Sequence, residues 1–254
     1  MLKFKAIILI LIGMTASYLN GSEKPTLNVG TTSGYAPFVS LNAQGEYEGF
    51  DIDVAELLAK ELNRKLVIKD LGSMPSLFIG LKQGKIDVAI WAISITPERL
   101  KQMNMIPYQG NGESTFPLLF WKQIPEEMTS LEDLERSKKY TISVEVGSYQ
   151  EQVLRAYPSI PRVDADKITD ALLNLKFKKV TAIAIEPAIL PNLLKQNPEL
   201  RVLNCPLPKE LQEQGNGIAL TKENTGLTAE IQRAIENLRA QGKLQELEKK
   251  WGLQ

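Results

Sequence analysis

Histidine is absent from the 254-residue chain, and cysteine occurs once, at Cys205. Without histidine, a Ser-His or Cys-His nucleophile and a His-ligated metal site are excluded. A single thiol cannot form an intrachain disulfide and is a poor basis for a metal site. Catalysis would have to rest on carboxylates, lysine, tyrosine or serine, so the composition favours binding. We therefore expect a protein that is not an enzyme, with no catalytic residue, no metal and no cofactor.

Neither sign of charge is in excess, because thirty Lys and Arg residues balance thirty Asp and Glu residues. No stretch is rich in basic residues, and none interleaves basic with aromatic residues, so we expect no nucleic-acid partner. Long apolar runs are also scarce. The run Ala6–Met14 is too short to cross a bilayer, which needs about 20 residues, and no later stretch is longer and as apolar.

That short run has the flanks of a secretory signal. Lys3 and Lys5 precede it, and small polar residues follow from Thr15 to Ser22. This order is typical of a cleavable signal peptide, so we expect residues 1–22 to be removed on export to the periplasm. No cysteine lies near the cleavage region, which argues against a lipid anchor. An uncleaved membrane anchor is the alternative.

Helix and strand patterns alternate through the rest of the chain. Asp51–Asn63 and Ser76–Gly84 have helical apolar spacing, Asp87–Ile93 resembles a buried strand, and Thr96–Met103 predicts a short helix with Pro97 in its first turn. Further helices are predicted at 130–138, 149–157, 168–177, 188–195, 227–240 and 243–251, and further strands at 27–30, 66–68, 141–146, 181–185, 200–203 and 218–220. The alternation predicts two α/β units with parallel sheets.

Six segments follow one another in a distinctive order. They are VGTTSGYAPF (Val29–Phe38), GEYEGFDIDVAELLAKEL (Gly45–Leu62), LKQGKIDVAI (Leu81–Ile90), SITPERLKQMNMIPY (Ser94–Tyr108), VEVGSYQEQVL (Val144–Leu154) and LQELEKKWGL (Leu244–Leu253). Together they resemble the polar-amino-acid branch of periplasmic solute-binding proteins, the receptors of ABC-type importers. The resemblance covers nearly all of residues 26–254. Met105–Tyr108 and Glu186-Pro187 bring the chain nearest to the arginine-binding members.

The resemblance implies an α/β fold of the two-lobe periplasmic binding protein type (type II), with lobes joined by two crossing strands. Lobe 1 would comprise residues 23–111 plus 217–254, and lobe 2 would be the insertion 112–216. The crossings would lie near 111–115 and 214–218. The implied function is to capture a free amino acid between the lobes and deliver it to a membrane permease. We expect a monomer.

In that family, an arginine and nearby hydroxyl and backbone groups hold the ligand's carboxylate. Arg99 and Ser94 match these positions in lobe 1, and a planar guanidinium suits a carboxylate because it binds both oxygens. Ser148 and Tyr149, behind Gly147 at a predicted helix start, match the contacts from lobe 2. Outside this family pattern, Arg99 would be a solvated arginine and Ser148 an ordinary helix cap.

The ammonium and the side chain of a ligand need other partners. Glu186 aligns with the aspartate that most members use for the ammonium, at the end of an apolar strand. Tyr35 fits an aromatic wall, whereas Met74 replaces the phenylalanine of many relatives. Trp91 would restore an aromatic surface or fill the core. Phe38 and Phe50 are expected in the core.

Specificity depends on two positions that depart from relatives. Thr32 stands where lysine/arginine/ornithine-binding relatives have an acidic group. Glu145 stands where glutamine-binding relatives have a lysine, at the side-chain end of the pocket, and a carboxylate there favours a cationic ligand. Arginine or another basic or polar amino acid is therefore expected, unless Glu145 is an outward-facing strand residue.

Two other functions use the same fold. Some of its members are dehydratases of cyclic carboxylic acids, in which Arg99 would hold the substrate and Glu186 would act as a general acid. An amino-acid sensor using the same cleft is the other alternative.

Overall fold

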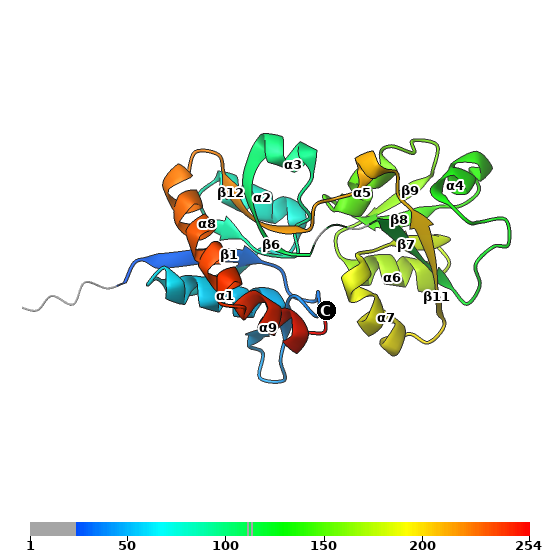
Figure 1. Ribbon diagram of the computed structural model, residues 1–254. Helices are drawn as coiled ribbons and strands as arrows, with labels where there is room; N and C mark the ends of the chain where they lie inside the picture. The colour runs from blue at the N-terminus through cyan, green and yellow to red at the C-terminus, as the bar shows by residue number, and fades with distance from the viewer. Residues whose placement is uncertain (1–23, 111, 113) are drawn as a thin grey trace, which may run out of the picture.

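The computed structural model describes residues 24–110, 112 and 114–254, and Figure 1 shows two α/β lobes side by side. The predicted signal peptide, residues 1–22, lies outside the described residues. Within the described residues, none of the helices combines the length and the apolar character that a membrane crossing requires.

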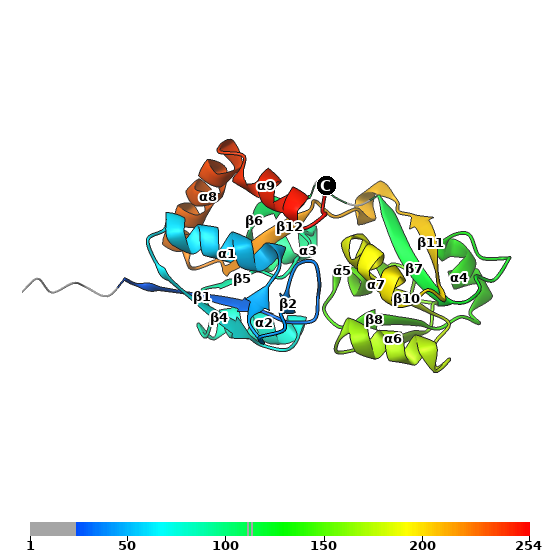
Figure 2. The same ribbon diagram turned by 90° about the horizontal axis from the view of Figure 1, so that it is seen from below.

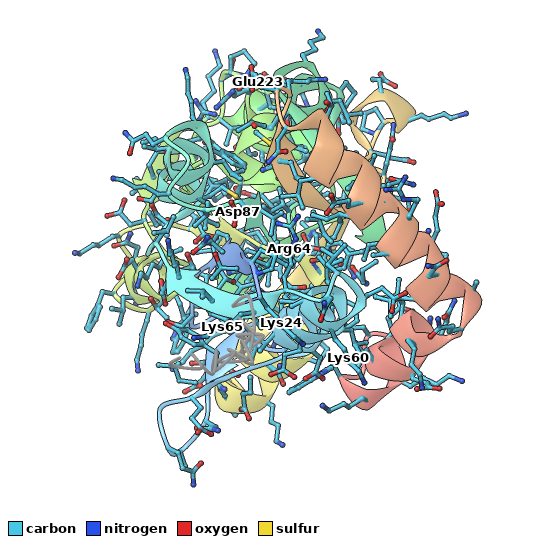
Figure 3. The ribbon with its side chains drawn as sticks, turned by 90° about the vertical axis from the view of Figure 1, so that its left-hand side faces the viewer. Lys24, Lys60, Arg64, Lys65, Asp87 and Glu223 are labelled. Carbon is cyan, nitrogen blue, oxygen red and sulfur yellow. The ribbon has the colours of Figure 1, made fainter. Side chains whose placement is uncertain are left out.

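Lobe 1 is built on a five-stranded sheet in the order β4-β1-β5-β12-β6. Its strands are β1 (Thr26–Thr31), β4 (Lys65–Asp70), β5 (Val88–Ala89), β6 (Met103–Gln109) and β12 (Asn216–Thr221). β1 pairs in parallel with β4 and β5, whereas β12 runs antiparallel to β5 and β6. The Lys65 amide donates to the Pro25 carbonyl where β1 and β4 begin, and Figure 3 looks onto this end of the sheet, with Lys24 and Lys65 labelled.

Helices cover both faces of this sheet. They are α1 (Phe50–Glu61), α2 (Met74–Lys82), α3 (Pro97–Gln102), α8 (Thr225–Ala240) and α9 (Lys243–Lys250). Figure 2 shows α1, α8 and α9 on one side of the sheet and α2 on the other. A small hairpin of β2 (Ser40–Leu41) and β3 (Tyr47–Glu48) precedes α1. α1 buries Val54, Ala55 and Leu58, the apolar stripe that its spacing predicts.

Lobe 2 has its own five-stranded sheet, in the order β11-β7-β10-β8-β9. Its strands are β7 (Thr115–Trp121), β8 (Ile142–Glu145), β9 (Arg162–Ala165), β10 (Ala182–Ala184) and β11 (Leu200–Pro206). Its helices are α4 (Leu131–Ser137), α5 (Tyr149–Leu154), α6 (Ile168–Lys176), α7 (Leu190–Gln196) and the 3-10 turns η1 (Pro187–Ile189) and η2 (Lys209–Leu211). Alternate residues of β7 enter different cores: Phe116 and Phe120 pack with α4 and α5, whereas Leu119 packs with α6.

The chain passes between the two sheets twice, from β6 to β7 and back from β11 through η2 to β12. The type II architecture expected from the sequence is thus confirmed. The returning segment is hydrogen-bonded to the one that holds Ser94: the Ile95 amide donates to the Gly215 carbonyl at 2.7 Å, and the Gln214 amide donates to the Ile95 carbonyl at 3.1 Å. The proposed boundaries at residues 111 and 216 stay a prediction, and Asn111 itself lies outside the described residues.

Two predictions about the strands were wrong. Both sheets are mixed rather than parallel, because β12 and β7 run against their neighbours. The chain enters β7 and β12 from the other lobe. No helix of the same lobe leads directly into either strand, so the parallel direction that a strand–helix–strand connection gives is not required. The strand predicted at 87–93 is also shorter, because pairing ends at Ala89 and the chain turns at Ala92, which has a φ of 42°.

Candidate functional site

A narrow cavity lies between the lobes, and both lobes contribute to its wall. The nine residues that the sequence predicts for the site all line it, together with two that it does not predict. The lining residues are Tyr35, Met74, Trp91, Ala92, Ser94, Arg99, Glu145, Ser148, Tyr149, Gln150 and Glu186. Their roles toward a ligand stay a prediction at this point.

Arg99 is positioned by the start of α3. The Thr96 hydroxyl caps this helix by accepting the Arg99 amide hydrogen at 3.3 Å, and the side chain is 7% exposed. Its guanidinium donates to the Ser94 carbonyl at 2.6 Å and, across the cleft, to the Gly147 carbonyl at 2.8 Å. Because a guanidinium has five N–H donors, others remain for a ligand.

Arg99 stays protonated at neutral pH although its side chain is buried. Burial lowers the pKa of the guanidinium to about 10, while Glu98, Glu186 and Glu213 raise it. A group with that pKa is fully protonated at neutral pH. The cavity therefore holds a permanent cation whose remaining donors can meet an anionic group.

The lobe 2 wall opposite Arg99 is the start of α5. Ser148 caps this helix, since its hydroxyl accepts the Glu151 amide hydrogen at 3.0 Å. The Tyr149 hydroxyl donates to the Leu211 carbonyl, so this hydroxyl is already engaged. Gly147 has a φ of 77°, and a Cβ there would lie 3.3 Å from Cγ of Met74 in lobe 1. The two lobes are thus in close contact at this point.

Glu186 follows β10 and precedes the turn η1, as expected for a group at the end of an apolar strand. It is 8% exposed, and Gln150 donates to its Oε2 at 3.2 Å. Gln150 was missed at the sequence level because it lies 36 residues from Glu186 in the chain. This hydrogen bond orients the carboxylate of Glu186.

Glu145 ends β8 and is 6% exposed, so it faces the cavity rather than solvent. Burial raises the pKa of its carboxyl to about 8, while Lys167 lowers it and Asp170 raises it. A buried carboxyl of this kind is mostly protonated at neutral pH in the empty cavity. A cation placed beside it would favour the ionised form.

Aromatic and apolar groups close the cavity on the lobe 1 side. The rings of Tyr35 and Trp91 are tilted, with centroids 5.1 Å apart, and Met74 packs beside them in the same wall. Trp91 is 3% exposed, and its indole nitrogen has no hydrogen-bond partner in the described part of the chain. Its ring is thus buried and also forms part of the cavity wall, and its role toward a ligand stays a prediction. Phe38 and Phe50 are fully buried in the core, as predicted.

Thr32 lies apart from this wall, buried beyond the end of β1, and is not among the lining residues. A larger hollow of about 690 Å³ lies beside the C-terminus and the crossings. It is lined by residues such as Arg239 and Glu248, and it gathers fewer buried charges than the cavity does. Buried ionisable groups converging on one cavity are the stronger indication of a binding site.

Residues 27–254 match the family described as bacterial extracellular solute-binding proteins, family 3. The chain belongs to this family. A family 3 relative, the probable ABC transporter arginine-binding protein ArtJ of Chlamydia trachomatis serovar D, is 32% identical over 225 residues, which cover 89% of this chain and 85% of the relative.

Solved structures of similar proteins give the same fold. An ancestral arginine-binding protein bound to glutamine is 30% identical with a TM-score of 0.78, covering 90% of this chain and 98% of that one. An ancestral amino acid-binding protein described as a precursor of cyclohexadienyl dehydratase is 25% identical with a TM-score of 0.76, covering 89% and 94%. This family 3 chain is therefore similar to amino-acid receptors and to one ancestor of an enzyme.

Proposed function

We propose that this chain is a periplasmic receptor that captures a free cationic amino acid, with arginine as the first candidate, and delivers it to an ABC-type permease. The observation that carries the proposal is the charge of the cavity. One buried guanidinium, Arg99, faces two buried carboxylates, Glu145 and Glu186. With both carboxylates ionised the wall has a net charge of −1 (+1 − 2), which complements a ligand of net charge +1.

Each charged group of such a ligand has a partner. The α-carboxylate binds to Arg99 and the Ser94 segment in lobe 1, and to Ser148 and Tyr149 in lobe 2. The α-ammonium binds to Glu186, which Gln150 already orients. Charge-assisted hydrogen bonds of this type are roughly twice as strong as neutral ones.

The side chain of the ligand extends along the aromatic wall toward Glu145. Tyr35 and Trp91 provide π surfaces for a guanidinium or ammonium group, and Met74 adapts to the aliphatic part. Glu145 then pairs with the cation at the far end. A neutral side chain would gain less, because it would have no charge to pair with the ionised form of Glu145.

Binding proceeds by closure of the two lobes. Tyr35, Ser94 and Arg99 bind the ligand first, and closure adds Glu145, Ser148 and Glu186 from lobe 2. The ligand favours the closed form only through these contacts across the cleft, since equal affinity for both forms would shift nothing. The names of relatives, which include arginine-binding proteins of ABC transporters, support the ligand class and the permease as partner. Export by the predicted signal peptide at residues 1–22 would place the receptor in the periplasm.

Isothermal titration calorimetry with the twenty amino acids tests the proposal. We expect tight binding of arginine, weaker binding of lysine, and little binding of acidic amino acids. Two analogues separate the ends of the ligand: agmatine lacks the α-carboxylate, and argininic acid lacks the α-ammonium. Both should bind at least 100-fold more weakly than arginine. Tight binding of agmatine would show that Arg99 does not bind the α-carboxylate.

The matching protein variant is Arg99→Ala. It should weaken arginine binding by at least about 30-fold, because truncating one partner of a buried charge pair costs about 2–5 kcal/mol. Arg99→Lys retains the charge but loses the planar fork, so its affinity should be intermediate. The titrations are made well below the melting temperature of the variant, because losing the hydrogen bonds to the Ser94 and Gly147 carbonyls lowers its stability. Unchanged arginine affinity in Arg99→Ala would contradict the proposal.

A dehydratase is the second candidate, favoured by the resemblance to the ancestral precursor of cyclohexadienyl dehydratase. In this case Arg99 would bind the substrate carboxylate, and Glu186 would protonate the leaving hydroxyl. Incubation with cyclohexadienyl carboxylic acids distinguishes the two candidates. Turnover that is lost in Glu186→Gln would favour the enzyme, and absence of turnover with tight arginine binding would favour the receptor.

A further inference from the structure

A buried carboxylate, Asp51, lies directly behind the cavity wall. It is the second residue of α1 and is 1% exposed. Its Oδ2 accepts the amide hydrogen of Ala92 at 2.8 Å, and its Oδ1 accepts the hydroxyl hydrogen of Tyr108 at 2.7 Å. It is not among the residues that line the cavity, so its contact with a ligand would be indirect.

The turn that Asp51 holds is part of the cavity wall. Trp91 and Ala92 both line the cavity, and Trp91 packs against Tyr35. Ala92 has a φ of 42°, in the left-handed region that residues other than glycine rarely adopt. Such a conformation costs on the order of 1–3 kcal/mol and persists only where its surroundings impose it. The hydrogen bond from Ala92 to Asp51 is one contact that holds this conformation.

The second partner connects the same carboxylate to a strand that leaves the lobe. Tyr108 lies near the end of β6, and the Phe50 ring stacks on it with centroids 5.9 Å apart and planes at 15°. The next residue, Gln109, accepts a hydrogen bond from the Asn216 side chain at 2.7 Å, beside the crossing. Asp51 therefore joins the turn at Trp91 to the strand that approaches the crossing.

Keeping a carboxylate here is costly. Burial raises the pKa of Asp51 to about 7, while the hydrogen bonds from Tyr108 and Ala92 lower it. No salt bridge reaches Asp51 within the described residues. The ionisable groups that sense its charge are Tyr108 and, across the cavity wall, Tyr35. An apolar residue would fill this space at lower cost, so a carboxylate in this position points to a role beyond packing.

We propose that Asp51 is a positioning residue for ligand capture, whose side chain fixes the Trp91–Ala92 turn in the shape that the ligand meets. This inference rests on the proposed function, since it concerns the same cavity. It adds Asp51, which touches no ligand atom, to the residues that determine ligand affinity. Without the acceptor at position 51, the turn would relax from its strained conformation and move the Trp91 ring away from Tyr35.

Three variants test the inference by arginine titration. Asp51→Leu has a similar size but no acceptor, so the Ala92 amide loses its partner. Asp51→Asn retains an acceptor for Ala92, and its amide group can donate to the Tyr108 oxygen. Asp53→Leu is the matched control: it lies two residues further along α1 and accepts bonds from Lys250 and, at 2.7 Å, from the Trp251 indole, away from the cavity.

We expect Asp51→Leu to raise the arginine Kd at least tenfold, Asp51→Asn to restore it to within about threefold of the unmodified protein, and Asp53→Leu to leave it unchanged. The titrations are run well below each melting temperature, where all molecules are folded. A purely structural residue would lower the melting temperature but leave this Kd unaltered. Equal affinity in Asp51→Leu and the unmodified protein, or a Kd in Asp51→Asn as high as in Asp51→Leu, would overturn the inference.

Amino-acid binding by the unmodified protein distinguishes a failure of this inference from a failure of the proposed function. If it binds no amino acid, the proposed function fails; if it binds arginine and Asp51→Leu binds equally well, only the inference fails. Should Asp51→Leu not fold, Asp51→Ala replaces it, and hydrogen exchange in the unmodified, ligand-free protein gives a measurement without a variant. The Ala92 amide should be strongly protected, and exchange at the rate of an open loop would overturn the inference.

Discussion

Glu145 and Glu186 are two carboxylates of one cavity with different surroundings. Gln150 donates to Glu186, and Glu186 acts on Arg99 through its charge. Glu145 is dominated by burial, which raises the pKa of its carboxyl to about 8. In the proposed complex, Glu186 binds the α-ammonium, a group that every amino-acid ligand carries. Glu145 instead gains its charge when a cationic side chain arrives.

The affinity for arginine should therefore depend on pH through Glu145. The free cavity holds this carboxyl protonated below about pH 8, whereas the complex favours the ionised form, so binding releases a proton. Arginine affinity should fall as the pH is lowered from 8 to 5, by up to about tenfold per unit. Calorimetry in buffers of different ionisation enthalpy measures the released proton.

The control for this dependence is Glu145→Gln with both arginine and glutamine. The variant should bind arginine at least tenfold more weakly at pH 8 and should lose the pH dependence, because no carboxyl remains to titrate. Glutamine binding should be nearly independent of pH in both proteins. Arginine affinity that stays constant from pH 5 to 8 in the unmodified protein would remove Glu145 from the side-chain end of the site.

Site residues that belong to a local sequence pattern could be predicted, and those that act through another residue could not. Arg99, Ser148 and Glu186 each follow a recognisable segment and do line one cavity. Asp51 lies inside such a segment too, but its partners Ala92 and Tyr108 are 41 and 57 residues away. Pairings at that separation are set by the tertiary fold, which periodicity does not encode.

At the level of elements, the helices were easier to predict than the strands. α4 begins at the predicted cap, with Ser130 and Asp133 forming the full capping box. β6 and β7 escaped prediction because each contains a proline, at Pro107 and Pro117. β6 is an edge strand, where a missing N–H is tolerated. β9 is short and exposed on three of its four residues, so it lacks a strand-like apolar pattern.

The segment that returns to lobe 1 contains a glycine at which a side chain would crowd both crossings. Gly215 has a φ of 86°, and an added Cβ would lie 2.7 Å from the carbonyl oxygens of Gln109 and Gly110. Gly215→Ala should therefore strain both crossings, lower the stability by about 1–3 kcal/mol and weaken arginine binding at least threefold. Chemical denaturation and calorimetry measure the two effects.

Gly242→Ala is the matched control for the crossing. Gly242 has a similar φ of 73°, but nothing lies within 4 Å of an added Cβ. This variant should lose about 1 kcal/mol or somewhat more from backbone strain alone and keep its arginine affinity. Equal affinities in the Gly215 and Gly242 variants would show that the crossing does not contribute to ligand binding.

For the whole molecule, direct contacts join the lobes across the cleft. Across the cleft, Arg99 donates to Gly147, Met74 packs on Gly147, and Arg155 lies 3.6 Å from Glu98. The last pair is about half exposed, so it contributes little. A ligand that binds to residues of both lobes adds its own contacts to these and so favours the closed form.

Ligand should therefore stabilise the whole fold. At arginine concentrations near 100 times Kd, the added stability is about 2.7 kcal/mol, which corresponds to a rise of roughly 5 to 10 °C in melting temperature for a protein of this size. Differential scanning calorimetry with increasing arginine measures the rise, and Arg99→Ala should show almost none. A full rise in that variant would mean that arginine binds elsewhere.

The cavity between the lobes is lined by side chains from both of them, and Met74 and Gly147 lie close together across the cleft. A ligand bound to both lobes must lose the contacts of one lobe before it leaves. Its departure rate then has an upper limit set by how often the lobes separate. Substitutions at the crossings could lengthen or shorten the residence time of every ligand by the same factor, without changing which ligand is preferred.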